Sequence, residues 1–269
     1  MSIFSLENKV AVVTGANGKL GIIWTEVLAV NGCAVVATDL QEIPCDHIAR
    51  IMNHFPDSIA YCGEIDITKR DDALRLNEFC KNKYGVASVL VNNAGIDQPP
   101  AKDAAPYTIE DYPEDVFCDI LRVNSFGTFN MIQVFGNEMR NRGGGSIINI
   151  GSLYASVSPD EKFYTHLATE SGAFIKPPSY GMSKAAVVNL TKYLATHWGR
   201  YGIRVNTLSP GGVEGGQDAE FKKKFCDRVP IGRMAKSGDL VGPLVFLASD
   251  ASQYVTGIEL KVDGGFTAW

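Results

Sequence analysis

Short apolar runs alternate along the chain with longer stretches in which apolar residues recur at helical spacing. The runs are four to six residues long and rich in β-branched side chains, which is typical of strands buried on both faces of a parallel sheet. The seven strands that this pattern predicts are Val10–Thr14, Cys33–Thr38, Ile59–Cys62, Val89–Asn92, Ser146–Ile150, Arg204–Leu208 and Ile258–Val262. The predicted helices are Leu20–Val30, Asp46–His54, Asp71–Lys83, Glu114–Arg140, Ser179–Tyr201 and Gly238–Ser249. Strands and helices in alternation predict an α/β fold with a doubly wound sheet.

Two longer segments, Asp97–Tyr112 and Leu153–Pro178, interrupt this alternation, and each contains three prolines. Both follow a predicted strand at its carboxyl end, which is where ligands bind in open α/β sheets. Because long loops in compact domains are usually functional, we expect these segments to form walls or a lid over a site. No repeat, low-complexity tract or Pro/Ser-rich linker divides the sequence, so we expect residues 1–269 to form one domain.

The charge balance and the cysteine spacing exclude several classes of protein. Lys and Arg total 25 and Asp and Glu total 30, a formal net charge of −5, which is the reverse of the basic excess usual in nucleic-acid binders. The apolar runs are far shorter than the roughly 18 residues of a membrane span, and the first residues lack the pattern of a secretory signal. We therefore expect a cytoplasmic protein with no nucleic-acid or membrane partner. Six cysteines without a CxxC pair indicate reduced, packed thiols and no metal site.

A glycine-rich turn joins the first predicted strand to the first predicted helix, with the sequence TGANGKLG at residues 14–21. Such a turn lets the backbone approach a pyrophosphate, whose charge is met by the helix N-terminus. Asp39 ends the second predicted strand, 18 residues after Gly21. An acidic residue at this distance accepts hydrogen bonds from the adenosine ribose and repels a 2′-phosphate, which favours NAD(H) over NADP(H). The alternative is that Asp39 only caps a helix or a turn.

Tyr180 and Lys184 are one turn apart on a predicted helix and therefore share a face. A phenol is a poor acid or base at neutral pH, but a nearby ammonium group stabilises the phenolate. A tyrosine and a lysine placed in this way can pass a proton to or from a substrate oxygen. The spacing alone is common in helices, so the pair is informative only together with the glycine-rich turn.

Taken together, these motifs resemble the short-chain dehydrogenase/reductase family over Lys9 to Gly265. The matching pieces, in order, are TGANGKLG at 14–21, Asp39, Asp66-Ile67, Asn92-Asn93-Ala94-Gly95, Val123-Asn124, Ile148 to Ser152, YGMSK at 180–184, Ile203 to Asn206, Ser209 to Gly212 and Val262 to Gly265. The resemblance implies a single-domain Rossmann fold, with a doubly wound seven-stranded parallel sheet and helices on both faces. It also implies an NAD(P)-dependent oxidoreductase that acts on CH–OH groups.

The resemblance implies a catalytic tetrad of Asn124, Ser152, Tyr180 and Lys184. Tyr180 would be the acid/base, and Ser152 would hold the substrate oxygen. Lys184 would bind the nicotinamide ribose and lower the pKa of Tyr180, while Asn124 would hold a water of the proton relay. The residues implied for cofactor binding are Gly15, Asn17, Lys19, Leu20, Gly21, Asp39, Leu40, Asp66, Ile67, Asn93, Ala94, Gly95, Tyr180, Lys184, Pro210, Gly211 and Val213.

Two residues depart from the family pattern in the cofactor region. Lys19 stands where the glycine-rich turn usually has its middle glycine, and basic residues in this turn often accompany NADP(H) in the family. Gly215 stands where the family often has a threonine that bonds the nicotinamide carboxamide. Either this hydrogen bond is missing and cofactor binding is weaker, or Gln217 takes the place of the threonine. Because Asp39 is expected nearest the 2′ position, we expect NAD(H) as the preferred cofactor and NADP(H) as the alternative.

The segment between Ser152 and Tyr180 has 27 residues, more than is usual in the family. Its polar and aromatic side chains suit a polyhydroxylated substrate such as a sugar, with Ser152, Tyr154 and Tyr180 as the expected substrate contacts. The alternative is a surface or subunit-contact loop over about residues 153–178. Three lysines, Lys222 to Lys224, follow the expected nicotinamide loop, either on a solvated helix face or on a lid that would favour an anionic substrate.

The function expected from these features is hydride transfer between nicotinamide and a secondary alcohol or ketone, with a sugar derivative as one substrate class. The sequence also resembles a bacterial branch of the family that modifies surface sugars and flagellin. The alternatives are a 3-oxoacyl-thioester reductase and a catalytically silent nucleotide-binding scaffold. Family members commonly assemble through their long helices and apolar C-terminus, so we expect a homo-oligomer, either a tetramer or a dimer.

Overall fold

The computed structural model describes residues 2–97, 107–167 and 174–269. Seven parallel strands form one sheet in the order β3-β2-β1-β4-β5-β6-β7. Their bounds are β1 Val10–Thr14, β2 Ala34–Thr38, β3 Ile59–Cys62, β4 Val89–Asn92, β5 Gly145–Ile150, β6 Ile203–Pro210 and β7 Glu259–Val262. The order reverses between β1 and β4, and the carboxyl ends of these two strands are therefore where a doubly wound sheet binds its ligand.

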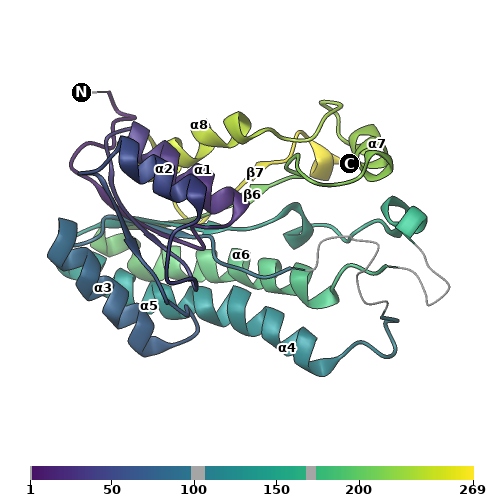
Figure 1. The fold of residues 1–269 in the computed structure, drawn as a ribbon, viewed down its shortest axis with the longest axis horizontal. Helices are drawn as coiled ribbons and strands as arrows, with labels where there is room; N and C mark the ends of the chain where they lie inside the picture. Colours follow the sequence, from purple (N-terminus) through teal and green to yellow (C-terminus); the bar gives the residue numbers. More distant parts are fainter. Residues whose placement is uncertain (1, 98–106, 168–173) are drawn as a thin grey trace.

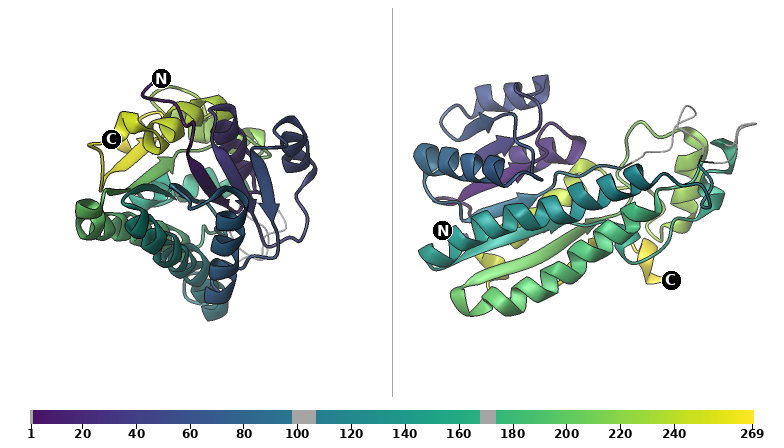
Figure 2. Two further views of the ribbon diagram at one scale, coloured as in Figure 1. Left: turned by 90° about the vertical axis from the view of Figure 1, so that its left-hand side faces the viewer. Right: turned by 90° about the horizontal axis from the view of Figure 1, so that it is seen from below.

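Helices cover both faces of the sheet, as the sequence predicted (Figure 1). The helices are α1 Lys19–Val30, α2 Asp46–His54, α3 Arg70–Tyr84, α4 Glu114–Leu121, α5 Thr128–Arg142, α6 Pro178–Trp198, α7 Ala219–Arg228 and α8 Ser237–Ala248. One core cluster packs α1, α2 and α8 against the sheet, and a second packs α3, α5 and α6 against the opposite face. Figure 2 shows the strands between these two helical layers. The predicted fold, a single domain of the Rossmann type, is confirmed.

The expected continuous helix over Glu114–Arg140 is wrong in one respect. A π-helical turn at Arg122–Gly127 separates α4 from α5, and Asn124 lies within it. A π turn inserts an extra residue into the helical repeat, so the side chains before and after it no longer follow one helical register. The apolar periodicity on either side is unchanged, which is why the sequence pattern did not indicate the interruption.

A third cluster, rich in aromatic residues, packs the described residues of the 153–178 segment onto α7 at the carboxyl edge of the sheet. The ring of Phe163 lies 5.9 Å from that of Phe225 and 6.2 Å from that of Phe266, measured between centroids. His166 is mostly buried, and its Nε2 atom lies 2.9 Å from a carboxylate oxygen of Asp218. The described part of this segment is therefore packed on the domain through its own apolar side chains.

Candidate active site

The glycine-rich turn brings the N-terminus of α1 close to the carboxyl ends of β1 and β4. Gly15 has φ of +65°, and a Cβ atom there would lie 2.7 Å from Ala94 Cα. A Cβ atom on Gly21 would lie 2.1 Å from the Gly15 carbonyl oxygen. The hydroxyl oxygen of Thr14 accepts hydrogen bonds from the backbone N–H groups of Asn93, at 3.1 Å, and of Ala94, at 3.0 Å. These close approaches require glycine and leave a backbone cradle at the helix N-terminus.

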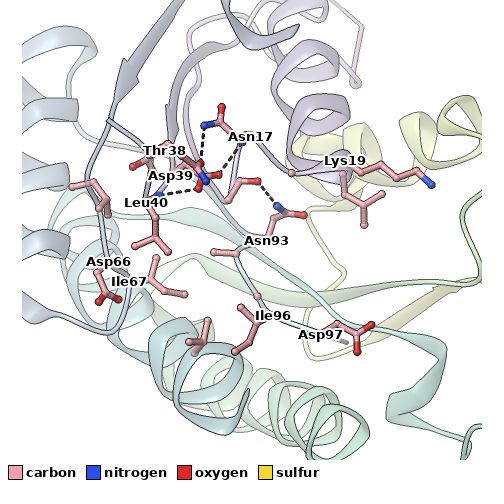
Figure 3. Close-up of a pocket in the computed structure, with 18 residues that line it drawn as sticks. Asn17, Lys19, Thr38, Asp39, Leu40, Asp66, Ile67, Asn93, Ile96 and Asp97 are labelled. Atoms are coloured by element: carbon pink, nitrogen blue, oxygen red, sulfur yellow. Dashed lines mark hydrogen bonds between the residues drawn. The ribbon is translucent and has the colours of Figure 1, made fainter. Parts of the chain in front are cut away.

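A cavity of about 690 Å³ runs along the carboxyl edge of the sheet from this cradle (Figure 3). Eleven of the residues predicted to bind the cofactor line it: Gly15, Asn17, Lys19, Leu20, Asp39, Leu40, Asp66, Ile67, Asn93, Ala94 and Gly95. Gly21 does not line it, because it packs beneath Gly15. Of the other predicted cofactor residues, Tyr180 and Gly211 line a neighbouring cavity, whereas Lys184, Pro210 and Val213 line neither.

Asp39 lies at one end of this cavity, directly after β2. One carboxylate oxygen accepts a hydrogen bond from the backbone N–H of Asn17 at 2.9 Å, and the other accepts one from the N–H of Leu40 at 2.8 Å. The side-chain amide of Asn17 donates in turn to Gln41 Oε1 at 2.9 Å and to the hydroxyl of Tyr61 at 3.0 Å. This network holds the Asp39 carboxylate where the second strand meets the glycine-rich turn.

The side chain of Lys19 points away from Asp39 (Figure 3). Its ammonium group donates to the carbonyl oxygen of Val213 at 2.9 Å and also to that of Glu214. Partial burial lowers the pKa of Lys19, and the nearby Glu214 opposes this shift. Lys19 therefore fastens the glycine-rich turn to the loop that follows β6.

A second cavity, of about 490 Å³, adjoins the first, and Lys19 and Asp97 line both. Ser152, Tyr154 and Tyr180, the residues expected to contact the substrate, line this second cavity together with Gly211. The segment after β5 and the helix α7 contribute its aromatic wall, through Tyr164, Phe221 and Phe225. The structure thus brings the predicted substrate residues to the end of the predicted cofactor cavity.

Tyr180 lies in the first turn of α6, and its environment favours the neutral phenol. Burial is the largest effect and raises the pKa of Tyr180; the carboxylate of Asp97 raises it further, while a hydrogen bond with Ser152 lowers it. We expected Lys184 to lower this pKa, but burial and Asp97 act in the opposite direction and outweigh Ser152. The Nζ atom of Lys184 lies over the ring of Tyr180, 5.8 Å from its centroid.

Lys184 is buried behind Tyr180, with only 6% of its surface exposed. Its ammonium group donates to the carbonyl oxygen of Ile150 at 2.9 Å. Burial lowers the pKa of Lys184 to about 8, and the carboxylate of Asp97 opposes that shift. A lysine in this setting changes its protonation state near neutral pH, which is the range in which a proton relay operates.

The side chain of Asn124 forms hydrogen bonds with the backbone of the segment that follows β4. Its amide donates to the carbonyl oxygen of Ile96 at 2.9 Å and to the hydroxyl of Ser183 at 3.1 Å, and its carbonyl oxygen accepts from the N–H of Ile96 at 2.8 Å. Asn124 therefore holds the residue that immediately precedes Asp97. A water contact, as expected from the resemblance, would be additional to these bonds.

The loop after β6 lies across the junction of the two cavities. Gly211 donates its N–H to the carbonyl oxygen of Val262 at 2.9 Å, which ties the loop to β7. The amide of Gln217 accepts from the N–H of Gly215 at 2.8 Å and donates to the carbonyl oxygen of Val213 at 3.0 Å. Gln217 thus folds this loop on itself, although the sequence suggested that it takes the place of a missing threonine.

Two charged residues of the second cavity were missed at the sequence level: Asp97 and Lys176. They form an ion pair in the wall of the cavity. Asp97 begins one of the two long segments, after β4, and Lys176 lies near the end of the other, before α6. These positions were the only signal in the sequence that the two residues belong to the site. By contrast, Lys222, Lys223 and Lys224 do not line the cavity, and Lys222 and Lys224 pair with Glu214 and Glu220.

Within residues 2–97, 107–167 and 174–269, no group of three or more His, Cys, Asp or Glu residues is placed to hold a metal ion. The helices in these same ranges include none that is long and apolar enough to span a bilayer.

Comparison with known proteins identifies the family. A family model described as "Enoyl-(Acyl carrier protein) reductase" matches residues 15–267. The 2-dehydro-3-deoxy-D-gluconate 5-dehydrogenase of Escherichia coli is 33% identical over 100% of this chain and 99% of its own length. The NAD-dependent glycerol dehydrogenase of Listeria innocua is 32% identical over 98% of this chain and 96% of its own length. The chain belongs to the short-chain dehydrogenase/reductase family.

Solved structures agree with this assignment. A gluconate 5-dehydrogenase from Burkholderia cenocepacia, in complex with NADP and tartrate, has a TM-score of 0.84 and 31% identity over 99% of this chain and 98% of that one. A short chain dehydrogenase from Leptospira borgpetersenii with bound NAD+ has a TM-score of 0.83 and 31% identity, over 98% and 95%. The protein is an oxidoreductase of the class that acts on CH–OH groups with NAD(P), as the sequence predicted.

Proposed function

We propose that this enzyme transfers hydride between NAD(H) and a secondary alcohol or ketone of a polyol or sugar derivative. The observation that carries the proposal is the junction of the two cavities, where Ser152 and Tyr180 face one cavity and the glycine-rich turn borders the other. Relatives whose names give polyol or sugar-acid substrates support it. They include the glycerol dehydrogenase of Listeria innocua and the galactitol 2-dehydrogenase of Cereibacter sphaeroides.

The backbone of the glycine-rich turn gives the first cavity a shape that suits a nicotinamide dinucleotide. A Cβ atom on Gly15 or Gly21 would collide with neighbouring backbone, so the cradle at the N-terminus of α1 exists only with glycine at these positions. When bound, the nicotinamide supplies or accepts the hydride. We assign the pyrophosphate to the turn at residues 15–21. The adenosine is assigned to Asp39, Leu40, Asp66 and Ile67. The nicotinamide end is assigned to Asn93, Ala94, Gly95, Tyr180, Lys184, Pro210, Gly211 and Val213.

The proposed preference for NAD(H) rests on Asp39. Its carboxylate is held by two backbone N–H groups at the end of the cavity, where a 2′-phosphate would meet its negative charge. Lys19, the feature that favoured NADP(H) at the sequence level, donates to two carbonyl oxygens on the other side of the turn. Its charge is therefore directed away from the 2′ position. NADP(H) remains the alternative cofactor.

We propose that Tyr180 moves the proton at the substrate oxygen and that Ser152 holds this oxygen. The raised pKa of Tyr180 suits a general acid, which donates its proton to a ketone oxygen during reduction. In the oxidation direction the same residue acts as a base and needs the buried ammonium of Lys184 beside it. Asn124 holds the backbone between the two cavities. The catalytic set is then Asn124, Ser152, Tyr180 and Lys184, with Ser152, Tyr154 and Tyr180 in contact with substrate.

The proposed organisation is one NAD(P)-binding domain over residues 1–269, to which the segment at about 153–178 adds a substrate-side wall. The aromatic contacts of this segment with α7 support that part of the proposal. We further propose a cytoplasmic homo-oligomer, a tetramer or a dimer. Apolar side chains exposed on the surface, such as Tyr193 at 65% and Trp269 at 72%, are the residues that subunit contacts would cover. Light scattering that gives the mass of a single chain would contradict the oligomer.

The test is turnover of a polyol and ketose panel with NAD+ or NADH, by the wild type and by Tyr180→Phe. We expect Tyr180→Phe to abolish turnover and to leave NADH binding, followed by nicotinamide fluorescence, nearly unchanged. Turnover that survives this substitution would refute the assigned acid/base. Turnover of 3-oxoacyl thioesters alone would favour that alternative activity, and cofactor binding without turnover of any substrate would favour the silent scaffold.

A further inference from the structure

An ion pair between Asp97 and Lys176 lies in the wall of the substrate cavity, next to the proposed acid/base. The ammonium group of Lys176 donates to a carboxylate oxygen of Asp97. Its Nζ atom also lies 4.9 Å from the centroid of the Tyr180 ring and 5.9 Å from that of Tyr154. The pair is therefore adjacent to the side chain of Tyr180, the proposed acid/base.

The two partners come from distant parts of the chain and differ in exposure. Asp97 follows β4, and its side chain is 32% exposed; Lys176 precedes α6, and its side chain is 7% exposed. Asp97 also lines the cofactor cavity, so it stands at the junction of the two. A substrate at this junction would meet a carboxylate acceptor and an ammonium donor side by side.

The ammonium groups that line the cavity already have partners within the protein. Among the described residues, the charged side chains that line it are Lys19, Asp97 and Lys176. The ammonium group of Lys19 is directed to the carbonyl oxygens of Val213 and Glu214. The charge of Lys176 is met by Asp97, with which it is paired.

We infer that Asp97 and Lys176 form a donor–acceptor pair that binds neighbouring hydroxyl groups of the substrate and selects neutral polyols and ketoses against sugar acids. This inference rests on the proposed function of the same cavity. A vicinal diol offers both a donor and an acceptor, which Asp97 and Lys176 can satisfy without loss of their own pairing. The carboxylate of a sugar acid in the same position faces Asp97, and like charges so close in a partly desolvated site disfavour binding.

The relatives fall into two groups by the charge of the substrate that their names give. Those in Listeria innocua and Cereibacter sphaeroides are named for glycerol and galactitol, which are neutral, whereas the relative in Escherichia coli is named for a sugar acid. Overall identity is 30% to 33% in all three comparisons and therefore does not decide between them. The inference predicts that this chain, like the relatives named for glycerol and galactitol, acts on neutral substrates.

The experiment compares matched substrates that differ only at one end, such as D-arabinitol with D-arabinonate and galactitol with galactonate. The quantity measured is kcat/KM for each with NAD+, and its ratio, neutral over acid, is the selectivity. We expect the wild type to prefer the neutral member by about 100-fold, and Asp97→Asn to reduce this selectivity at least about tenfold. Lys176→Met is expected to lower kcat/KM for both members and to leave the selectivity equal or higher, since the ammonium group that offsets the charge of Asp97 is then removed.

Two further variants separate recognition from a purely structural role. Lys176→Arg keeps the charge and is expected to retain most of the selectivity, whereas a loss of folding would affect both substrates equally. Lys223→Met removes an exposed charge of α7 outside the cavity, and its selectivity should equal that of the wild type. NADH affinity and the midpoint of thermal unfolding, measured for every variant, report whether the cofactor cavity and the fold are intact.

The outcomes distinguish this inference from the proposed function. Turnover with higher kcat/KM for the sugar acids, or equal selectivity in the wild type and in folded Asp97→Asn, overturns the role of the pair and leaves the dehydrogenase activity standing. No turnover of either member of any pair, with NAD+ or NADP+, overturns the proposed function itself. A lower selectivity in Asp97→Asn, together with an equal or higher selectivity in Lys176→Met, supports the inference.

Discussion

The ammonium group of Lys19 occupies the space that a side chain on Gly215 would need. A Cβ atom built on Gly215 would lie 2.6 Å from Lys19 Nζ. These are the two positions at which the cofactor region departs from the family pattern, one by gaining a side chain and the other by lacking one. The structure therefore links them: a side chain at position 215 would displace the ammonium group of Lys19 from its present place.

This relationship predicts strong coupling between the two positions. Gly215→Thr alone should weaken NADH binding, because the new side chain displaces Lys19 from the carbonyl oxygens of Val213 and Glu214. The double variant Lys19→Gly, Gly215→Thr should recover much of the loss, with an interaction energy of about 1 to 2 kcal/mol. Dissociation constants from nicotinamide fluorescence for the four proteins give this energy. Additive effects of the two substitutions would mean that the contact does not matter for binding.

Asp39 is predicted to set the choice between NADH and NADPH. Asp39→Asn removes the negative charge at the 2′ position, so the preference for NADH should fall by at least about tenfold, since like-charge repulsion is worth several kcal/mol. The free energy of unfolding should also fall, by about 1 to 2 kcal/mol, because the bonds from the N–H groups of Asn17 and Leu40 are weakened. Fluorescence titration with both nucleotides and urea unfolding measure the two effects. An unchanged ratio of the two affinities would show that Asp39 does not face the ribose.

Lys184 is predicted to destabilise the fold while it serves the reaction. Burial lowers its pKa from 10.5 to about 8. Below pH 8 the lysine is charged in both states, and the charged form costs more free energy in the folded protein than in the unfolded chain. Lys184→Met should therefore raise the free energy of unfolding at pH 7, by about 1 to 2 kcal/mol after the loss of the bond to Ile150.

The same substitution has a pH signature. Between pH 8 and 10.5 the unfolded wild type binds more protons than the folded protein, so wild-type stability rises with pH across this window. The advantage of Lys184→Met should shrink over the same range, as urea unfolding at pH 7 and pH 10 would measure. A Met variant that is less stable at pH 7 contradicts the prediction.

The pH dependence of alcohol oxidation is predicted to respond to Asp97. Among the described residues, the titratable and charged groups that face Tyr180 are Asp97, Tyr154, Lys176 and Lys184. After burial, Asp97 is the next largest cause of the raised pKa of Tyr180. Since oxidation requires the phenolate, Asp97→Asn should move the alkaline rise of kcat to lower pH, by about one unit. Asp57→Asn, at an exposed position remote from the site, is the control, and identical profiles for all three proteins would exclude an influence of Asp97.

The aromatic packing of the 153–178 segment is predicted to support substrate binding and not cofactor binding. Phe163→Ala removes a buried ring that contacts Phe221, Phe225 and Phe266, which should cost about 3 to 5 kcal/mol of local packing. KM for the polyol should rise, while the dissociation constant of NADH stays the same. Phe4→Ala, which truncates a ring that is 47% exposed, is the matched control. An unchanged KM together with a change in oligomeric mass would instead favour a subunit-contact role for the segment.

The sequence by itself determined the sheet, the helical layers and the family. Strands such as Val10–Thr14 and Val89–Asn92 are buried on both faces, so their apolar runs are continuous and can be recognised without tertiary information. The glycine-rich turn and the Tyr180–Lys184 pair are likewise local, because each depends on spacing within one turn or one helix. The interruption at Asn124 was missed, since a π turn leaves the apolar pattern on either side unchanged.

Only the tertiary structure decided how the charged side chains are used. Lys19 donates to Val213 in the loop after β6, which is 194 residues away in the chain. Asp97 and Lys176 are 79 residues apart, and no periodicity relates them. Long polar side chains at loop boundaries have several partners within reach, and which of them they meet depends on where the sheet places the ends of β4, β5 and β6. The physical reason is that apolar burial is encoded by local pattern, whereas the pairing of charges is encoded by the positions of distant backbone segments.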